Sequence, residues 1–140
     1  MQWVDGVSSL GADILVRDSF ERDKTVARVD EARMIAERVG WSGLGFDGRA
    51  CLLSAAVAPK ALYACAIAAL PARPLARLRQ AVCGALWGQE RRLRCKEVVF
   101  TLLSMGHRLD PEQRDEYESL VGLRRMLANR VDLHGGFLTA

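Results

Sequence analysis

The chain has 140 residues, of which 50% are hydrophobic and only 6% aromatic, and its formal net charge is +3. This length suits one domain with a substantial core, and abundant Ala, Leu, Val and Arg with few aromatic residues favour helices over a β-sandwich. The four cysteines form no CxxC pair and the two histidines stand apart, which argues against a disulfide framework and against a zinc site.

No targeting signal is recognisable at the N-terminus, which lacks the basic and apolar regions of a signal peptide. The most apolar stretch, residues 50–70, approaches the length of a membrane span. However, Pro59 and Lys60 stand at its middle, and a lysine at the bilayer centre costs roughly 3 kcal/mol. We therefore expect no membrane partner and an intracellular location, in the cytoplasm or the nucleus.

The predicted elements begin with a short strand or hairpin arm at residues 10–17, where Ile14 and Val16 alternate with their neighbours. An amphipathic helix follows at residues 22–39, and Gly40 supplies its stop. Residues 41–48 form a glycine-rich turn. They do not match the GxxxxGK[ST] pattern of a phosphate-binding loop, so we predict no nucleotide site there.

Further helices are predicted through the rest of the chain. The apolar stretch divides into helices at residues 49–58 and 59–70, because Pro59 suits the first turn of a new helix. A helix with an apolar stripe then ends at Gly88, another runs over residues 92–105 until Gly106, and Asp110 is the expected N-cap of a last helix over residues 111–129. One buried cluster is expected from Leu52, Leu53, Val57, Leu62, Ile67, Leu78, Val82 and Leu86.

The sequence shows no constellation of catalytic side chains. It contains no HExxH, no GxSxG and no paired Asp-Asp, and its acids are scattered among Arg and Lys. We therefore predict no catalytic residue, no metal site and no cofactor. In particular, we expect no nucleotide incorporation on a primed template, because no Asp pair is present to hold two metal ions.

The distribution of charge is the main functional signal. Residues 71–96 carry seven cations and a single acid, Glu90, which is a balance of +6 within a chain of net charge +3. Such a basic segment suits phosphate contacts, although a solvated, arginine-rich linker between helices is an equally good interpretation of the composition. The candidate phosphate-binding residues are Arg73, Arg77, Arg79, Arg91, Arg92, Arg94 and Lys96.

A series of short motifs resembles one protein family. Residues 10–13 read LGAD, an arginine-rich segment follows at 22–38, and then come GL at 43–44, GR at 48–49, VAPKALYA at 57–64, LARLRQAV at 75–82 and ALWG at 85–88. In order and spacing these motifs resemble the end of the palm and the thumb of reverse transcriptases from non-LTR (LINE-type) retrotransposons. Residues 106–111 and 123–127 are similar to a continuation in some protist elements.

The resemblance implies a fold and a role. It implies a mainly α, thumb-like helical bundle with one short N-terminal β element, divided into a palm remnant at 1–20, the thumb-like domain at 21–130 and a loose tail at 131–140. Such a thumb grips the phosphate backbone of an RNA–DNA or DNA duplex, and the strand before it helps to seat the primer end. Its further partners would be the palm and fingers of the parent polymerase.

Two departures from the family pattern limit what the resemblance implies. The aromatic-x-Asp-Asp motif of the palm lies upstream of the matching region and is missing here, as are the fingers, so the chain would be a fragment that is not an enzyme in isolation. Ala64 also stands where the family usually has Gly. The alternative is a helical protein–protein interaction module with no nucleic-acid role, which exposed Trp41, Trp87 and leucine faces would favour.

Overall fold

The computed structural model describes residues 6–9, 12–15, 23–63, 65, 70–88, 95–103 and 106–129. Over these residues the protein is mainly helical, as its composition and periodicity predict. Two short strands, β1 (Gly6–Ser9) and β2 (Ala12–Leu15), pair antiparallel with Val7 opposite Ile14. The N-terminal residues before this hairpin and the tail at 131–140 lie outside the described residues.

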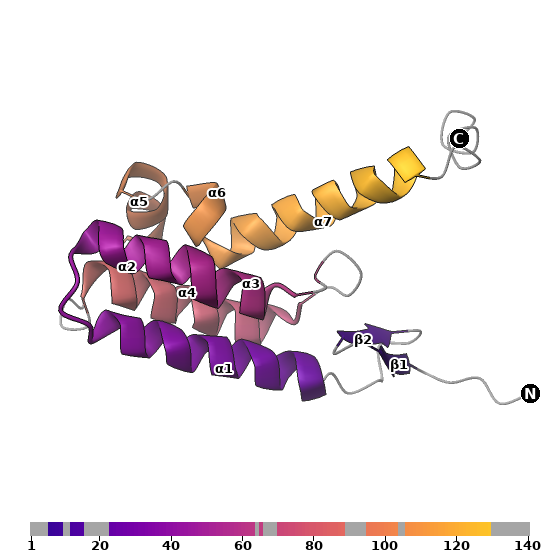
Figure 1. The fold of residues 1–140 in the computed structure, drawn as a ribbon, viewed down its shortest axis with the longest axis horizontal. Coiled ribbons are helices and arrows are strands. Elements are labelled where there is room, and N and C mark those ends of the chain that lie inside the picture. The colour runs from indigo at the N-terminus through magenta and orange to yellow at the C-terminus, as the bar shows by residue number, and fades with distance from the viewer. Residues whose placement is uncertain are drawn as a thin grey trace, which may run out of the picture.

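The first long helix, α1 (Asp23–Gly40), has nearly the bounds that the sequence predicts. Its buried face carries Val29, Ala32, Ala36 and Val39 at helical spacing. The two alanines allow a close approach of the neighbouring helix, and α1 packs mainly against α4 (Ala72–Trp87), which lies beside it in Figure 1.

The apolar stretch that follows is one continuous helical run, and the predicted break at Pro59 is wrong. It consists of α2 (Phe46–Leu52), a π-helical turn η1 (Leu53–Val57) and α3 (Ala58–Ala61). Proline within a helix lacks an N–H and collides with the carbonyl four residues before it. The wider π turn immediately before Pro59, in which the Ala58 N–H pairs with the Leu53 carbonyl, relieves this collision. The run ends at Ala61, well short of the predicted residue 70.

Helix α4 ends before Gly88, as the sequence pattern predicts. Its apolar stripe, Leu75, Leu78, Val82 and Leu86, is buried in the core. The C-cap residue is Gly88, whose φ of 102° lies in the left-handed region that glycine adopts without strain.

The C-terminal part differs from the prediction in two places. Instead of a single helix over residues 92–105, the described chain has Cys95 in extended conformation, then α5 (Lys96–Val98) and a second π turn, η2 (Val99–Leu103). Gly106 begins a short helix, α6 (Gly106–Leu109), rather than closing one. Helix α7 (Pro111–Asn129) has the predicted bounds, and Asp110 caps it, because its Oδ1 accepts the Glu112 N–H at 3.1 Å.

The core confirms most of the predicted cluster: Leu53, Val57, Leu62, Leu78, Val82 and Leu86 are all buried. Leu52 is a wrong prediction, with 41% of its surface exposed, because neighbouring helical residues point about 100° apart and Leu53 takes the inward position. Ile67 lies outside the described residues. Phe100, which is fully buried in η2, completes the cluster.

None of the four cysteines forms a disulfide, and Cys65 and Cys83 are buried, whereas Cys51 and Cys95 are exposed. Within the part of the chain that the structure describes, no helix combines the length and the apolarity that crossing a membrane requires.

Candidate nucleic-acid interface

Helix α4 presents arginines on the side opposite to its buried stripe. Arg73 and Arg77 stand one turn apart, about 6 Å along the helix axis, and both are exposed. Neither makes an ion pair or a hydrogen bond with another described residue. Their guanidinium groups are therefore available to an anionic ligand.

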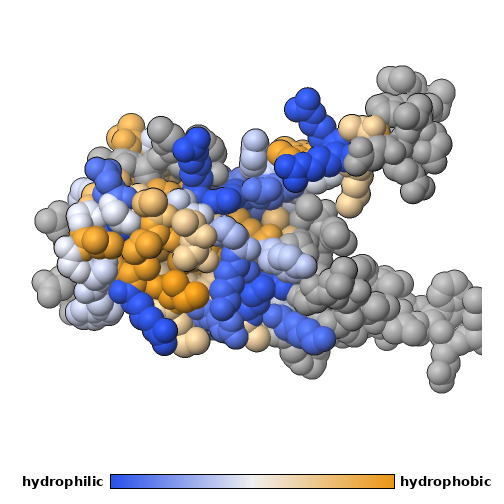
Figure 2. Space-filling model, viewed as in Figure 1, coloured by the Kyte–Doolittle hydropathy of each residue, from blue (hydrophilic) through white to orange (hydrophobic). Residues whose placement is uncertain are grey.

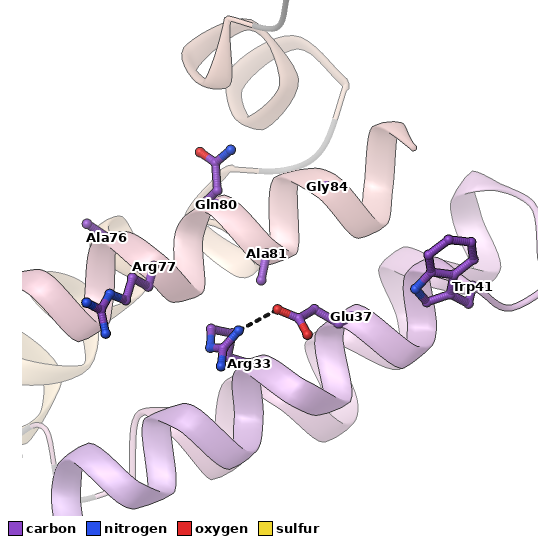
Figure 3. Close-up of a pocket in the computed structure, with 8 residues that line it drawn as sticks. All are labelled: Arg33, Glu37, Trp41, Ala76, Arg77, Gln80, Ala81 and Gly84. Atoms are coloured by element: carbon purple, nitrogen blue, oxygen red, sulfur yellow. Dashed lines mark hydrogen bonds and ion pairs between the residues drawn. The ribbon is translucent and has the colours of Figure 1, made fainter. Parts of the chain in front are cut away.

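An open groove of about 580 Å³ runs between α4 and α1 beside Arg77. Its walls are Arg33, Glu37 and Trp41 from α1 and the turn after it, and Ala76, Arg77, Gln80, Ala81 and Gly84 from α4. Figure 3 shows the Arg77 and Arg33 side chains at one end of this row and Trp41 at the other, while Gln80 points away from α1. The small residues Ala76, Ala81 and Gly84 of α4 leave this groove unfilled.

The charges of the groove are partly balanced within it. Arg33 donates to Glu37 Oε1 at 2.6 Å, and its Nε lies 3.4 Å from Asp30 Oδ1. Arg77 has no such partner among the described residues. Two cations face one carboxylate at the groove itself, so an anionic group is attracted most strongly at the Arg77 end.

Trp41 follows α1 directly and has 79% of its surface exposed. An indole that is this open offers a flat apolar surface at the far end of the groove. The arrangement can therefore bind a ligand that combines an anionic group near Arg77 with an apolar or aromatic group near Trp41.

Arg79 has a different role from the phosphate contact that the sequence suggested. Its Nε and Nη2 bind Asp110 in a bidentate pair, at 3.0 Å from Oδ1 and 2.9 Å from Oδ2. Its Nη1 lies 3.1 Å from Glu112 Oε2 and 3.6 Å from Glu97 Oε1. The Asp110 side chain is fully buried, and that of Arg79 is only 15% exposed. This ionic cluster holds α4 to the start of α7 and directs the Arg79 guanidinium toward carboxylates of its own chain.

The electrostatics of Arg79 follow from these partners. Burial works to lower its pKa, but the hydrogen bonds and charge of Asp110, with Glu112 and Glu97, outweigh burial and raise the pKa above its ordinary value. The guanidinium also stacks over the Phe100 ring, 5.5 Å from its centroid. Arg79 is thus a permanently charged structural residue.

The remaining predicted cations are less fully described. Lys96 is half-buried at the start of α5, beside Glu97. Arg91, Arg92 and Arg94 lie outside the described residues. The structure therefore groups Arg73 with Arg77, separates Arg79 from them, and adds Arg33 from α1. Sequence reasoning missed Arg33 because acids surround it in its own helix, and only the packing of α1 on α4 places it beside Arg77.

Within the described part of the chain, no group of three or more His, Cys, Asp and Glu side chains could hold a metal ion. Comparison of the chain with protein-family models, with curated proteins and with solved structures finds no match in any of the three.

Proposed function

We propose that the chain is a thumb-like module that binds the phosphate backbone of a nucleic-acid duplex, and that it derives from the reverse transcriptase of a non-LTR retrotransposon. The family part of this proposal rests on the ordered motifs of residues 10–90 and on the mainly helical fold that carries them. In this proposal, the short hairpin at the N-terminal end corresponds to the end of the parent enzyme's palm.

The binding part of the proposal rests on one observation, the exposed Arg73–Arg77 pair on α4, which makes no ion pair with a described residue. Arginine presents a fork of donors that matches phosphate oxygens. The buried stripe on the opposite side fixes α4 in the core, so the two guanidinium groups project from a rigid support. Two phosphates on a duplex strand are the targets that such a pair suits.

The same surface supports binding without sequence preference. Contacts to phosphate hold a protein on a duplex but do not read its bases. Arg77 of α4 and Arg33 of α1 line an open groove, where their guanidinium groups can reach phosphates. We propose that polymerisation, and any choice of template, belongs to the palm and fingers of the parent enzyme, which are the module's partners.

A binding assay with primer–template duplexes tests this function. We expect weak affinity, in the nonspecific range of about 10⁻⁴–10⁻⁶ M, equal for duplexes of unrelated sequence and falling steeply as salt rises. The variant Arg73→Ala/Arg77→Ala should bind more weakly, and the charge-matched control Arg38→Ala/Arg125→Ala, at exposed positions on other surfaces, should bind nearly as wild type. A wild-type chain with no duplex affinity at low salt would refute the proposal.

A second candidate function is the docking of a protein partner on an apolar surface. Trp41, Leu44 and Leu52 are large apolar residues with 79%, 44% and 41% of their surfaces exposed. Figure 2 shows hydrophobic side chains gathered on the half of the visible face where α2 lies. Trp87, in contrast, is half-buried and packs against the core, so it does not add to this surface. Partner binding that tolerates salt, without duplex binding, would favour this function.

A further inference from the structure

The groove between α1 and α4 combines two features that together match a nucleotide. Arg77 is exposed and makes no ion pair with a described residue, and Trp41 has 79% of its surface exposed. Both line the same groove of about 580 Å³, and Figure 3 shows them toward its opposite ends. A nucleotide carries an anionic phosphate and a flat aromatic base, so its two parts match the two ends of the groove.

The two helices set the direction in which such a ligand lies. They run the same way along the groove, because residue numbers rise from Arg33 to Trp41 on one wall and from Arg77 to Gly84 on the other (Figure 3). Helix α4 begins shortly before Arg77, so the positive end of its dipole lies on that side. Helix α1 ends immediately before Trp41, where its last carbonyls carry partial negative charge. A phosphate is therefore favoured at the Arg77 end.

Glu37 lies between the two ends and favours the same direction. It is the one acid among the residues that line the groove, and its Oε1 accepts a hydrogen bond from Arg33 at 2.6 Å. A phosphate beside this carboxylate would be repelled, whereas an uncharged base would not. The groove thus holds phosphate at the Arg77 end and leaves the Trp41 end to a base.

The Trp41 indole can stack on an unpaired base but not on a base inside a duplex. Inside a duplex both faces of a base are covered by its neighbours, whereas an unpaired base can place one face on an aromatic ring. Proteins that bind single strands combine a basic groove with such a ring. The groove is also open, whereas a site for a free small molecule encloses most of its ligand. A strand, which gains further contacts outside the groove, is therefore a better occupant than a free nucleotide.

We infer that this groove binds a single-stranded segment of nucleic acid, with a backbone phosphate at Arg77 and a neighbouring unpaired base stacked on Trp41. The inference rests on the proposed function, from which it takes phosphate binding by Arg77. It adds a second class of ligand, the unpaired strand, and a residue that distinguishes this strand from a duplex.

Fluorescence anisotropy with two oligonucleotides of equal length tests the stacking. One is an ordinary single strand, and the other carries the same phosphates on abasic sugars, so the ratio of their affinities isolates the bases. Wild type should bind the ordinary strand about tenfold or more tightly, which is the contribution of stacking on an aromatic ring. Trp41→Ala should abolish this preference, and Trp41→Phe, which keeps a ring, should retain part of it.

A second exposed aromatic residue supplies the matched control. Tyr117→Ala removes a side chain that is 54% exposed on α7, outside the groove, and should leave the preference unchanged. Circular dichroism verifies that each variant is folded. A preference that persists in folded Trp41→Ala, or that Tyr117→Ala reduces as much, would overturn the inference.

The same assay separates this inference from the proposed function. Arg77→Ala should weaken the binding of both oligonucleotides, because both carry phosphates. A wild type that binds blunt duplex but does not distinguish the two oligonucleotides would overturn the inference and leave duplex binding intact. A preference for the ordinary strand without duplex binding would support the inference and refute duplex binding. Adenosine monophosphate, at an equal concentration of nucleotide units, should not displace the strand, and displacement would overturn the strand as the occupant.

Discussion

Helix α4 carries two kinds of arginine within three residues, and their contrast separates structure from candidate function. Arg77 is exposed and has no ion pair with a described residue, whereas Arg79 binds three carboxylates and is mostly buried. Both belong to the same basic segment of the sequence. Their positions differ by 200° around the helix, which turns one toward solvent beside α1 and the other toward the start of α7.

A run of cations in the sequence is therefore not a uniform binding surface. A cation that faces buried acids stabilises the fold and cannot also bind phosphate, while its neighbour on the opposite side is available to a ligand. The two roles predict opposite consequences when each side chain is removed. Substitutions that separate loss of stability from loss of binding therefore test this division.

The largest expected effect is on stability, from Arg79→Ala. The change leaves the fully buried Asp110 and the nearby Glu97 and Glu112 without their common cation, and breaking a buried pair in this way costs about 3–5 kcal/mol. Arg77→Ala is the matched control, and as an exposed substitution it should change stability by less than about 0.5 kcal/mol. Urea denaturation of both variants gives the comparison. Equal losses would show that the ionic cluster does not hold α7 to α4.

The next effect concerns the apolar side of the same helix. Leu78 is 1% exposed in the core, and Leu78→Ala should cost about 2–5 kcal/mol through lost burial and the cavity that remains. Leu52→Ala serves as its control, because the exposed Leu52 side chain should cost under about 1 kcal/mol. A loss below half a kcal/mol at Leu78, measured by the same denaturation, would contradict the packing of α4 into the core.

A smaller, pH-dependent effect on stability is expected at Asp115 of α7. Burial raises the pKa of this carboxyl, and its Oδ1 has no hydrogen-bond partner. Because the folded pKa lies above the unfolded one, ionised Asp115 costs stability at pH values above its folded pKa, and the cost disappears as pH falls below the unfolded value near 3.8.

Asp115→Asn should therefore raise the melting temperature slightly at neutral pH, and the gain should shrink as the pH is lowered toward 4. Thermal melts at several pH values measure it. The exposed Glu116→Gln is the control and should show no such pH-dependent gain. A gain that stays constant over this range would show that the benefit does not come from the buried charge.

The sequence predicts the regular parts of this fold well, because periodic apolar spacing and caps are local signals. The bounds of α1 and α7, the end of α4 at Gly88 and the cap at Asp110 all follow from such signals. The π turn before Pro59 does not, since periodicity at 3.6 residues contains no sign of a widened turn. The pattern favoured a broken helix there instead.

The candidate site was less predictable than the fold. The basic segment identified Arg73 and Arg77, but local sequence cannot tell which arginine meets a carboxylate that is distant in the chain. Asp110, which binds Arg79, lies thirty-one residues further on, and Arg33 reaches the groove from another helix. Both facts depend on how helices pack, which no spacing within a helix reveals.

The salt dependence of duplex binding is the most direct test of phosphate binding by Arg73 and Arg77. Each phosphate contact that releases counterions adds to the slope of log affinity against log salt. If Arg73 and Arg77 each meet one phosphate, Arg73→Ala/Arg77→Ala should flatten that slope by up to about 2 units, in a variant that melts as wild type does. An unchanged slope in the folded variant would contradict the claim that this exposed pair, and not the buried Arg79, forms the phosphate-binding surface.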